Sequence, residues 1–390
     1  MYSRTLALPD HSFFLFGPRS TGKSTWLRKV LPDAKWFDLL RNDVFLSLSR
    51  DPARLRQEVL ALEPDRWIVI DEIQRIPALL TEVHALIAER PDAYRFALSG
   101  SSARKLRRMD VDLLAGRVFE RGFFPLSAAE AGEDFDLERS LAYGCLPKVV
   151  AEPEHSLDIL QAYAHTYLQQ EIQQEALVKD LGSFHRFLEV AALMNGQVVN
   201  ASAIARDAGV ARTTVERYLS VLIDTLIGYR LPAWRPRLKV KESQKPKFYL
   251  FDPGVVRALS GSLHDPVEKA ERGPLLETLV LHELRAHIDY AGIGGKLSYW
   301  RTPAGKEVDF VWSRGNKAVA IEVKASPRWR GTGSRALKEL AAAGVVQRTF
   351  AVYLGDVELV DGPVRVMPVA KFCQMLTEGE ILFPSFAGST

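Results

Sequence analysis

The sequence predicts an α/β protein with more than one domain, and three observations lead to this prediction. Over residues 1–127, short apolar runs alternate with helical patterns, as in a parallel sheet whose strands are joined by helices. Residues 181–262 combine three helical patterns with two strand-like runs, and residues 263–390 follow the order helix, three strands, helix, strand. Because a chain of 390 residues is too long for one ordinary core, we expect three domains, with residues 128–180 as a helical lid or connector.

Hydrophobic periodicity places the individual elements. In the first domain we expect strands at His11–Phe16, Lys35–Leu39, Trp67–Ile70 and Arg95–Leu98, and helices at Ser24–Leu31, Pro52–Leu62 and Leu79–Arg90. In the last domain we expect helices at Gly273–Ala286 and Ser334–Ala343, and strands at Leu297–Arg301, Glu307–Trp312, Ala318–Lys324 and Arg348–Leu354. The connector contains one long segment without Gly or Pro, Leu157–Gln174, which we expect to be a single helix.

The first predicted strand runs directly into a glycine-rich loop with the spacing G-x-x-x-x-G-K-[ST]. Its two glycines let successive backbone N–H groups turn toward a phosphate, and the following helix adds the positive end of its dipole. Lys23 can reach the β- and γ-phosphates of a nucleotide, and the Ser24 hydroxyl can bind Mg²⁺. The sequence therefore predicts a site for ATP and Mg²⁺ at Gly17, Pro18, Arg19, Ser20, Thr21, Gly22, Lys23, Ser24 and Thr25. The alternative is a glycine-rich turn with a buried lysine.

A second motif supports the nucleotide site, because the buried run Trp67–Ile70 ends in two carboxylates. Asp71 can hold Mg²⁺ through water, and Glu72 can act as the general base that polarises an attacking water. The alternative is that Asp71 caps a helix whose first turn contains Glu72. The pairing with the glycine-rich loop favours the first interpretation.

Two further residues are candidates for the reaction. Ser99 ends the next strand, where it can sense the γ-phosphate or hold the lytic water. Its segment can equally serve as a cap for a helix at Ala103–Arg108. Arg117 can be an arginine finger that completes the site of a neighbouring subunit, or it can be a surface residue.

Residues 181–262 predict a helix-turn-helix with a wing. Helical patterns occur at Gly182–Met194, Ala201–Ala208 and Arg212–Ile227, and strand-like runs follow at Gly228–Trp234 and Lys247–Phe251. Asn200 is expected to cap the second helix, and Gly209 supplies the turn.

This segment also carries the candidate contacts to DNA. In helix-turn-helix proteins the N-terminal residues of the last helix enter the major groove, which here are Arg212, Thr213 and Arg217. The loop between the two strand-like runs is basic, and its cations can contact phosphates: Arg235, Arg237, Lys239, Lys241, Lys245 and Lys247. DNA is therefore an expected partner. The alternative is a protein-docking module with a solvated charged loop.

The C-terminal domain contains a constellation of carboxylates and one lysine. Glu322 and Lys324 alternate along a predicted strand and therefore project from the same face. If the preceding strand pairs with this one, Asp309 joins them, and Glu277 on the preceding helix can add a carboxylate. Asp309 and Glu322 can then hold Mg²⁺, and Lys324 can orient a water. The alternative is an ion-paired strand in a fold that has lost its activity.

The composition of the chain indicates its cellular compartment and the state of its cysteines. A hydrophobic share of 47% and a charged share of 25% are typical of a globular protein in water. No apolar run reaches the ~18 residues of a membrane span, and Met1–Asp10 has no signal-peptide core, so we expect a cytoplasmic protein without a membrane partner. The two cysteines, Cys145 and Cys373, are expected to be buried free thiols, because a structural zinc site needs four ligands.

Taken together, the motifs resemble those of a known family. The chain is similar to prokaryotic AAA-type P-loop ATPases of the archaeal-ATPase branch, which carry a C-terminal domain of unknown function resembling the PD-(D/E)xK nuclease fold. The similar segments are Phe14–Thr25, Ile70–Gln74, Leu98–Ser102, Leu114–Arg117, Tyr249–Gly254 and Val308–Phe310. The resemblance implies an AAA-like P-loop NTPase domain with an extra strand between its two phosphate motifs, a winged helix-turn-helix middle and a restriction-endonuclease-like α/β end.

Three functions stay open at this point. The leading hypothesis is an ATP-driven enzyme that handles DNA, with subunits assembling into a homo-oligomer. The second is a slow regulatory ATPase that docks a protein partner, and the third is an ATP-gated, metal-dependent nuclease. A response of ATP hydrolysis to DNA separates the first hypothesis from the second.

Overall fold

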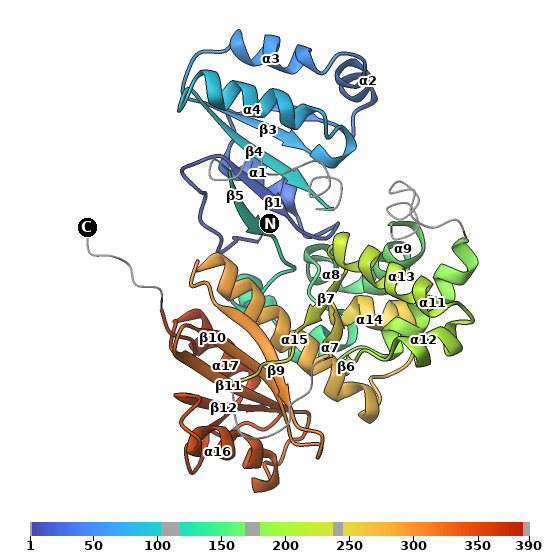
Figure 1. Cartoon of the computed structure of the whole chain (residues 1–390), viewed down its shortest axis with the longest axis vertical. Coiled ribbons are helices and arrows are strands. Elements are labelled where there is room, and N and C mark those ends of the chain that lie inside the picture. Colours follow the sequence, from blue (N-terminus) through green and yellow to red (C-terminus); the bar gives the residue numbers. More distant parts are fainter. Residues whose placement is uncertain (1, 103–117, 168–179, 237–244, 385–390) are drawn as a thin grey trace. The chain divides into compact units, whose positions relative to one another are not determined.

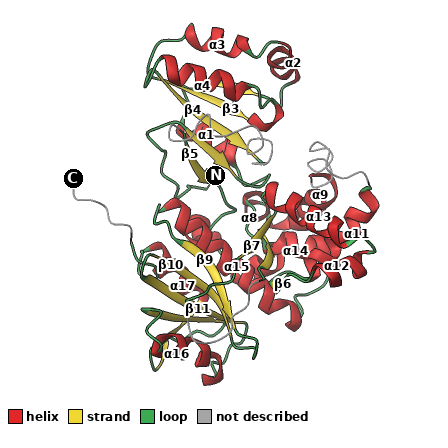
Figure 2. Cartoon of the chain, viewed as in Figure 1, coloured by secondary structure: helices red, strands yellow, loops and turns green. Residues whose placement is uncertain are grey.

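The computed structural model describes residues 2–102, 118–167, 180–236 and 245–384, which fall into two compact units (Figure 1). One unit contains residues 4–124 and 224–226, and we call it the N-terminal unit. The rest of the chain forms the C-terminal unit. Both units contain sheets with helices packed on them (Figure 2). Within the described ranges, no helix has the length and apolar character that crossing a membrane requires.

A five-stranded sheet with the order β2-β3-β4-β1-β5 forms the centre of the N-terminal unit, and all of its strand pairs are parallel. The strands are β1 (Phe13–Phe16), β2 (Lys35–Asp38), β3 (Arg66–Asp71), β4 (Tyr94–Gly100) and β5 (Phe119–Gly122). The helices are α1 (Lys23–Val30), α2 (Asn42–Arg50), α3 (Ala53–Leu60) and α4 (Leu79–Glu89). The expected alternation of strands and helices is confirmed, although α2 was not expected. Since β4 lies between β1 and β3, the ends of these three strands meet at one edge.

Apolar side chains cover both faces of this sheet. On one face, residues such as Phe14 and Ile70 pack with Leu55 of α3 and Val83 of α4. On the other face the ring of Phe13 lies 6.4 Å from that of Trp26 on α1. Because neighbouring residues of a strand point to opposite faces, β1 is buried on both sides and holds the loop that follows it in a fixed position.

The C-terminal unit has a six-stranded mixed sheet with the order β13-β14-β12-β11-β10-β9. Its strands are β9 (Lys296–Arg301), β10 (Glu307–Arg314), β11 (Lys317–Lys324), β12 (Arg348–Tyr353), β13 (Leu359–Asp361) and β14 (Val364–Pro368). Its helices are α15 (Lys269–Tyr290), α16 (Arg335–Ala342) and α17 (Val369–Thr377). The expected pairing of the Asp309 strand with the Glu322 strand is confirmed, since β10 and β11 are antiparallel neighbours.

The middle of the chain forms three helices and a three-stranded sheet with the order β6-β8-β7. These elements are α11 (Leu181–Leu193), β6 (Gln197–Val198), α12 (Ala201–Ala208), α13 (Arg212–Asp224), β7 (Gly228–Leu231) and β8 (Lys247–Leu250). The expected cap is confirmed, because the side chain of Asn200 accepts a hydrogen bond from Ala203 N at 3.2 Å. Gly209 ends α12 with a φ of 66°, in the left-handed region that favours glycine.

Residues 125–167 form short helices. They are α6 (Ala128–Ala131), α7 (Leu137–Tyr143), α8 (Pro147–Ala151) and α9 (Ser156–Ala162). The expected long helix begins at Ser156 but changes to a π-helical turn at Tyr163–Tyr167, and residues 168–174 lie outside the described ranges.

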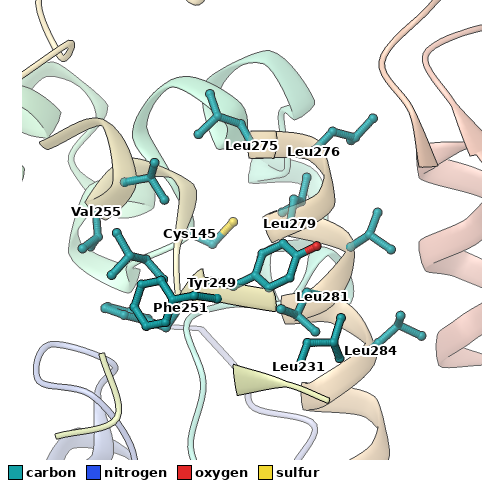
Figure 3. Close-up of a cluster of buried hydrophobic side chains, with 14 of the residues drawn as sticks. Cys145, Leu231, Tyr249, Phe251, Val255, Leu275, Leu276, Leu279, Leu281 and Leu284 are labelled. Atoms are coloured by element: carbon teal, nitrogen blue, oxygen red, sulfur yellow. The ribbon is translucent and has the colours of Figure 1, made fainter. Parts of the chain in front are cut away.

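One apolar core runs through the C-terminal unit and contains both cysteines. Figure 3 shows part of it, where Tyr249 lies beside leucines of α15 and Phe251 lies toward Val255. Cys145 and Cys373 are buried free thiols, as expected, and burial raises the pKa of each. Two protonated thiols in an apolar core are inert packing groups.

The segment Tyr249–Gly254 has a structural role in this core. Asp252 caps α14 (Pro253–Ser260) by accepting from Val255 N at 3.1 Å, and it also accepts from Cys145 N at 2.7 Å. Burial raises the pKa of Asp252 to about 6. A Cβ atom on Gly254 would clash with the carbonyl oxygen of Tyr143. This motif therefore joins α7 to α14 and has a packing role.

We expect Gly254→Ala to lower the free energy of unfolding of the C-terminal unit by about 3 kcal/mol, because the backbone of Tyr143 must move to admit the methyl group. The matched control is Gly182→Ala in α11, where the nearest atoms lie at ordinary contact distances of 3.5 Å or more from the added atom. That change should stabilise by about 0.5–1 kcal/mol. Thermal or urea unfolding checks both, and equal stability of the two variants would contradict the packing role of Gly254.

Candidate nucleotide site and carboxylate–lysine cluster

The glycine-rich loop joins the buried strand β1 to α1. Gly17 N donates to Gly100 O at 3.2 Å, and a Cβ atom on Gly17 would clash with the carbonyl oxygen of Phe123. Gly22 has a φ of 91° and precedes α1, whose N-terminus has no side-chain cap. The loop is therefore fitted between neighbouring strand ends, with the first amides of α1 available to an anion.

Lys23 lies folded back onto this loop. Its side chain is 5% exposed, and Nζ donates to Gly17 O at 2.7 Å and to Pro18 O at 3.0 Å. The Thr21 hydroxyl donates to the same Pro18 oxygen at 2.9 Å. The ammonium group is thus held inside the loop by neutral carbonyl oxygens.

Asp71 ends β3 beside the loop. Its carboxylate accepts a hydrogen bond from the hydroxyl of Ser99, and the hydroxyl of Ser24 lies near enough to influence its pKa. Burial raises the pKa of Asp71, and the charge of Glu72 adds to this effect, whereas the two hydroxyls and Lys23 lower it. The two residues expected to hold Mg²⁺, Ser24 and Asp71, therefore lie near each other, and their oxygen atoms are ligands that Mg²⁺ prefers.

Glu72 is held in a strained position by residues that the sequence did not single out. Its φ is 62°, in the left-handed region, which is uncommon for a residue with a side chain. Its carboxylate accepts from Gln74 Nε2 and from Ser101 Oγ, the latter at 3.1 Å. Its backbone N–H donates to Ser99 Oγ at 3.2 Å. The strain and the two donors fix the direction in which the carboxylate points.

The alternative assigned to this acidic pair, a helix cap, is wrong. Asp71 is the last residue of β3, and the short 3₁₀ turn that follows, Ile73–Arg75, has no side-chain cap. The role of Ser99 as a cap is not tested, because residues 103–117 lie outside the described ranges. The same holds for Arg117 as an arginine finger. Of the remaining loop residues, Thr21 is buried, Arg19 is half-buried, and Ser20 and Thr25 are exposed.

In the C-terminal unit, the structure brings the predicted carboxylates and lysine together. Asp309 of β10 accepts from Val323 N of β11 at 2.8 Å, and Lys324 pairs with Glu322 on that strand. Glu277 of α15 accepts from the hydroxyl of Tyr249 at 2.6 Å. Burial raises the pKa of both Glu277 and Glu322, and the charge of Asp309 adds to each shift.

Lys247 was expected to contact DNA phosphates, and this interpretation is wrong. The side chain is 3% exposed and points into the carboxylate cluster, where Nζ lies 2.5 Å from Glu307, 3.5 Å from Glu277 and 3.7 Å from Asp309. The period-two pattern of the strand indicates this buried position. Lys247 begins an apolar strand-like run, and its period-two neighbour Tyr249 faces the same way.

The described ranges contain no group of three Asp, Glu, His or Cys side chains arranged to hold a metal ion. In the carboxylate–lysine cluster, the ammonium groups of Lys247 and Lys324 supply the positive charge that faces the carboxylates. Burial alone would lower the pKa of Lys247, but Glu277, Asp309 and Glu307 together raise it.

The candidate DNA contacts are only partly described. Arg212, Thr213 and Arg217 are exposed at the beginning of α13, and Arg235 is exposed after β7. Three other cations of the predicted DNA-binding loop, Arg237, Lys239 and Lys241, lie outside the described ranges.

Comparison with known proteins agrees with the geometry of the N-terminal unit. Residues 10–132 match the family model described as an AAA domain. The N-terminal unit is therefore a P-loop ATPase domain of the AAA type, a class of nucleotide-binding domains. Residues 134–265 and 272–372 match two models described as domains of unknown function, DUF8612 and DUF4143.

Relatives extend over most of the chain. The uncharacterized proteins Rv2008c of Mycobacterium tuberculosis and Mb2031c of Mycobacterium bovis are each 30% identical over 352 residues, covering 88% of this chain and 76% of the relative. The chain belongs to the same family as these two mycobacterial proteins.

Several solved structures are more distantly similar. RuvB of Thermotoga maritima is 19% identical with a TM-score of 0.31, covering 57% of this chain and 82% of that chain. The ORC2 protein of Aeropyrum pernix is 13% identical with a TM-score of 0.26, covering 67% and 90%. The DNA clamp loader delta protein of Bacillus subtilis is 12% identical with a TM-score of 0.28, covering 70% and 95%. At these scores the functional argument rests on the side chains of the site and on the AAA domain match.

We expect Lys23→Ala to weaken ATP binding about 10- to 100-fold, the loss that one hydrogen bond to a charged group brings. Calorimetric titration with ATP and Mg²⁺ measures the change. Lys29→Ala is the control, because Lys29 lies exposed on the same helix and should leave the affinity unchanged. Equal affinity of the Lys23 variant and the unsubstituted chain would contradict the assigned site.

Proposed function

We propose that this chain hydrolyses ATP with the help of Mg²⁺ and uses the reaction to act on DNA. One observation carries the ATPase part of the proposal: the ends of β1, β3 and β4 bring the required groups close together. These groups are Lys23, Ser24, Asp71, Glu72 and Ser99.

The loop and Lys23 have the task of binding phosphates. The first amides of α1 and the ammonium group supply positive charge. Two hydrogen bonds of Lys23 go to neutral carbonyl oxygens, and a phosphate, which is charged, forms stronger hydrogen bonds with an ammonium group than these oxygens do. Ser24 and Asp71 would hold Mg²⁺, which when bound neutralises charge on the phosphate oxygens.

Glu72 has the role of general base. Its carboxylate can accept the proton of a water molecule as that water attacks the γ-phosphorus. Gln74 and Ser101 hold the carboxylate in one direction. The Ser99 hydroxyl links Glu72 to Asp71, because it accepts a hydrogen bond from the Glu72 amide and donates one to the Asp71 carboxylate. A fixed base of this kind keeps its orientation when the nucleotide binds.

We expect Glu72→Gln to lower the rate of ATP turnover about 10²- to 10⁴-fold while ATP still binds, because the amide can no longer accept the proton. Phosphate release under saturating ATP and Mg²⁺ measures turnover, and calorimetry measures binding. Glu82→Gln, on the half-buried first turn of α4, is the control. Turnover of the Glu72 variant within threefold of the unsubstituted chain would rule out the role.

For the DNA part, two features support a winged helix. Helices α12 and α13 flank the turn at Gly209, and the strand order β6-β8-β7 places two strands beside a basic loop. Exposed Arg212, Thr213 and Arg217 lie on the first turns of α13. A helix presented in this way can enter the major groove.

We also propose a restriction-endonuclease-like arrangement for the C-terminal sheet. Helix α15 precedes three antiparallel strands, β9 to β11, and α16 then leads to β12, which is parallel to β11. The cluster of Glu277, Asp309, Glu322 and Lys324 lies on these elements.

The double change Arg212→Ala with Arg217→Ala should weaken binding to duplex DNA and reduce the salt dependence of the affinity by about one unit of log K per log salt for each lost phosphate contact. Fluorescence anisotropy at several salt concentrations measures both quantities. Lys371→Ala on α17 removes a charge elsewhere in the same unit and should have no effect. No DNA binding by the unsubstituted chain at low salt would exclude this part of the proposal.

Stimulation of ATP turnover by DNA would distinguish a DNA-handling enzyme from a regulatory ATPase that docks a protein. Assembly into a homo-oligomer, with Arg117 completing a neighbour's site, stays a prediction.

A further inference from the structure

We propose that the ammonium group of Lys247 takes the place of a divalent metal ion in the carboxylate cluster of Glu277, Asp309 and Glu322, and so closes this cluster to metal. The inference rests on the nuclease-like arrangement proposed above for the C-terminal sheet. It does not depend on the ATPase.

The contacts of Lys247 are those of a captured cation. Three carboxylates surround Nζ, with Glu307 at 2.5 Å, Glu277 at 3.5 Å and Asp309 at 3.7 Å. The side chain is 3% exposed. Removing an ammonium group from water is costly unless charged partners compensate for it, so this position is specific and is not a chance conformation of a surface lysine.

The carboxylate cluster contains one buried oxygen atom for which the described residues supply no hydrogen-bond donor. Glu322 is 5% exposed, and its Oε2 atom has no hydrogen-bond partner, although the other oxygen pairs with Lys324. The charges of Asp309 and Glu277 both act on Glu322, which places its carboxylate beside theirs. A buried carboxylate oxygen without a donor is a ligand that a metal ion could use, whereas the neighbouring carboxylates Glu277 and Asp309 already face Lys247.

A divalent ion would need these oxygens at about 2.0–2.6 Å around one point. In the described part of the chain no three acidic, His or Cys side chains are arranged for this. The ammonium group explains the difference, since it occupies the space between Glu277 and Asp309 and holds both carboxylates at hydrogen-bonding or ion-pair distance.

Lys247 comes from a different element than its partners. It begins β8, immediately after the basic loop of the middle domain, whereas the carboxylates lie on α15 and β10. Both ends of that loop are fastened to Tyr299 of β9. Trp234 N donates to Tyr299 O at 2.7 Å, and the Tyr299 hydroxyl donates to Lys245 O at 2.5 Å. The backbone on both sides of the basic loop, and so the start of β8 with Lys247, is therefore fastened to the C-terminal sheet.

The test is a titration of the full chain with Mn²⁺ in the absence of nucleotide. The electron paramagnetic resonance signal of free Mn²⁺ measures how much of the ion is bound. Asp71→Asn is present in every variant to remove metal binding at the phosphate loop. Lys247→Met keeps the length of the side chain and removes its charge. We expect it to gain one Mn²⁺ per chain, bound at least tenfold more tightly than by the Lys247 chain, and to lose this gain when Asp309→Asn is added.

Lys247→Arg keeps the positive charge and is the matched control, with no gain expected. If Lys247→Met does not fold by circular dichroism, Lys247→Gln replaces it. The inference is overturned if a folded neutral variant gains no Mn²⁺, or if the chain with Lys247 already binds one Mn²⁺ that Asp309→Asn removes. Because ATP turnover is assayed separately on the chain with Asp71 intact, a failure of the ATPase proposal would leave this result readable.

Discussion

A buried ammonium group must be surrounded by oxygen atoms, and both candidate sites of this protein are organised around such a lysine. In the N-terminal unit Lys23 is 5% exposed and contacts the carbonyl oxygens of Gly17 and Pro18. In the C-terminal unit Lys247 is 3% exposed and contacts three carboxylates. The same requirement is met by neutral oxygens in one site and by charged oxygens in the other.

This difference in the partner oxygens separates the two lysines in function. Hydrogen bonds to neutral carbonyls are weaker than contacts with charged groups, so Lys23 can be transferred to a phosphate. Three carboxylates stabilise Lys247 where it lies, and removal of its ammonium group would leave their buried charges without this compensation. The first lysine is placed to exchange partners on binding, and the second is placed to stay.

Local motifs let the sequence predict much of the nucleotide site. The loop Gly17–Thr25 and the pair Asp71 and Glu72 each depend on a few consecutive residues, and the cap at Asn200 does too. Gln74 and Ser101 were missed, because their contacts with Glu72 require β3 and β4 to be neighbours. Lys247 was misassigned for the same reason, since its partners are supplied by α15 and β10. Helix α17 and strands β13 and β14 were not expected.

The central claim is that the loop after β1 encloses a triphosphate and that Lys23 moves to it from the backbone. A crystal structure with a non-hydrolysable ATP analogue and Mg²⁺ tests this most directly. We expect the triphosphate at the N-terminus of α1, with Lys23 Nζ bonded to phosphate oxygens and no longer to Gly17 and Pro18. A loop without triphosphate at saturating nucleotide, with Lys23 still on those two carbonyls, would contradict it.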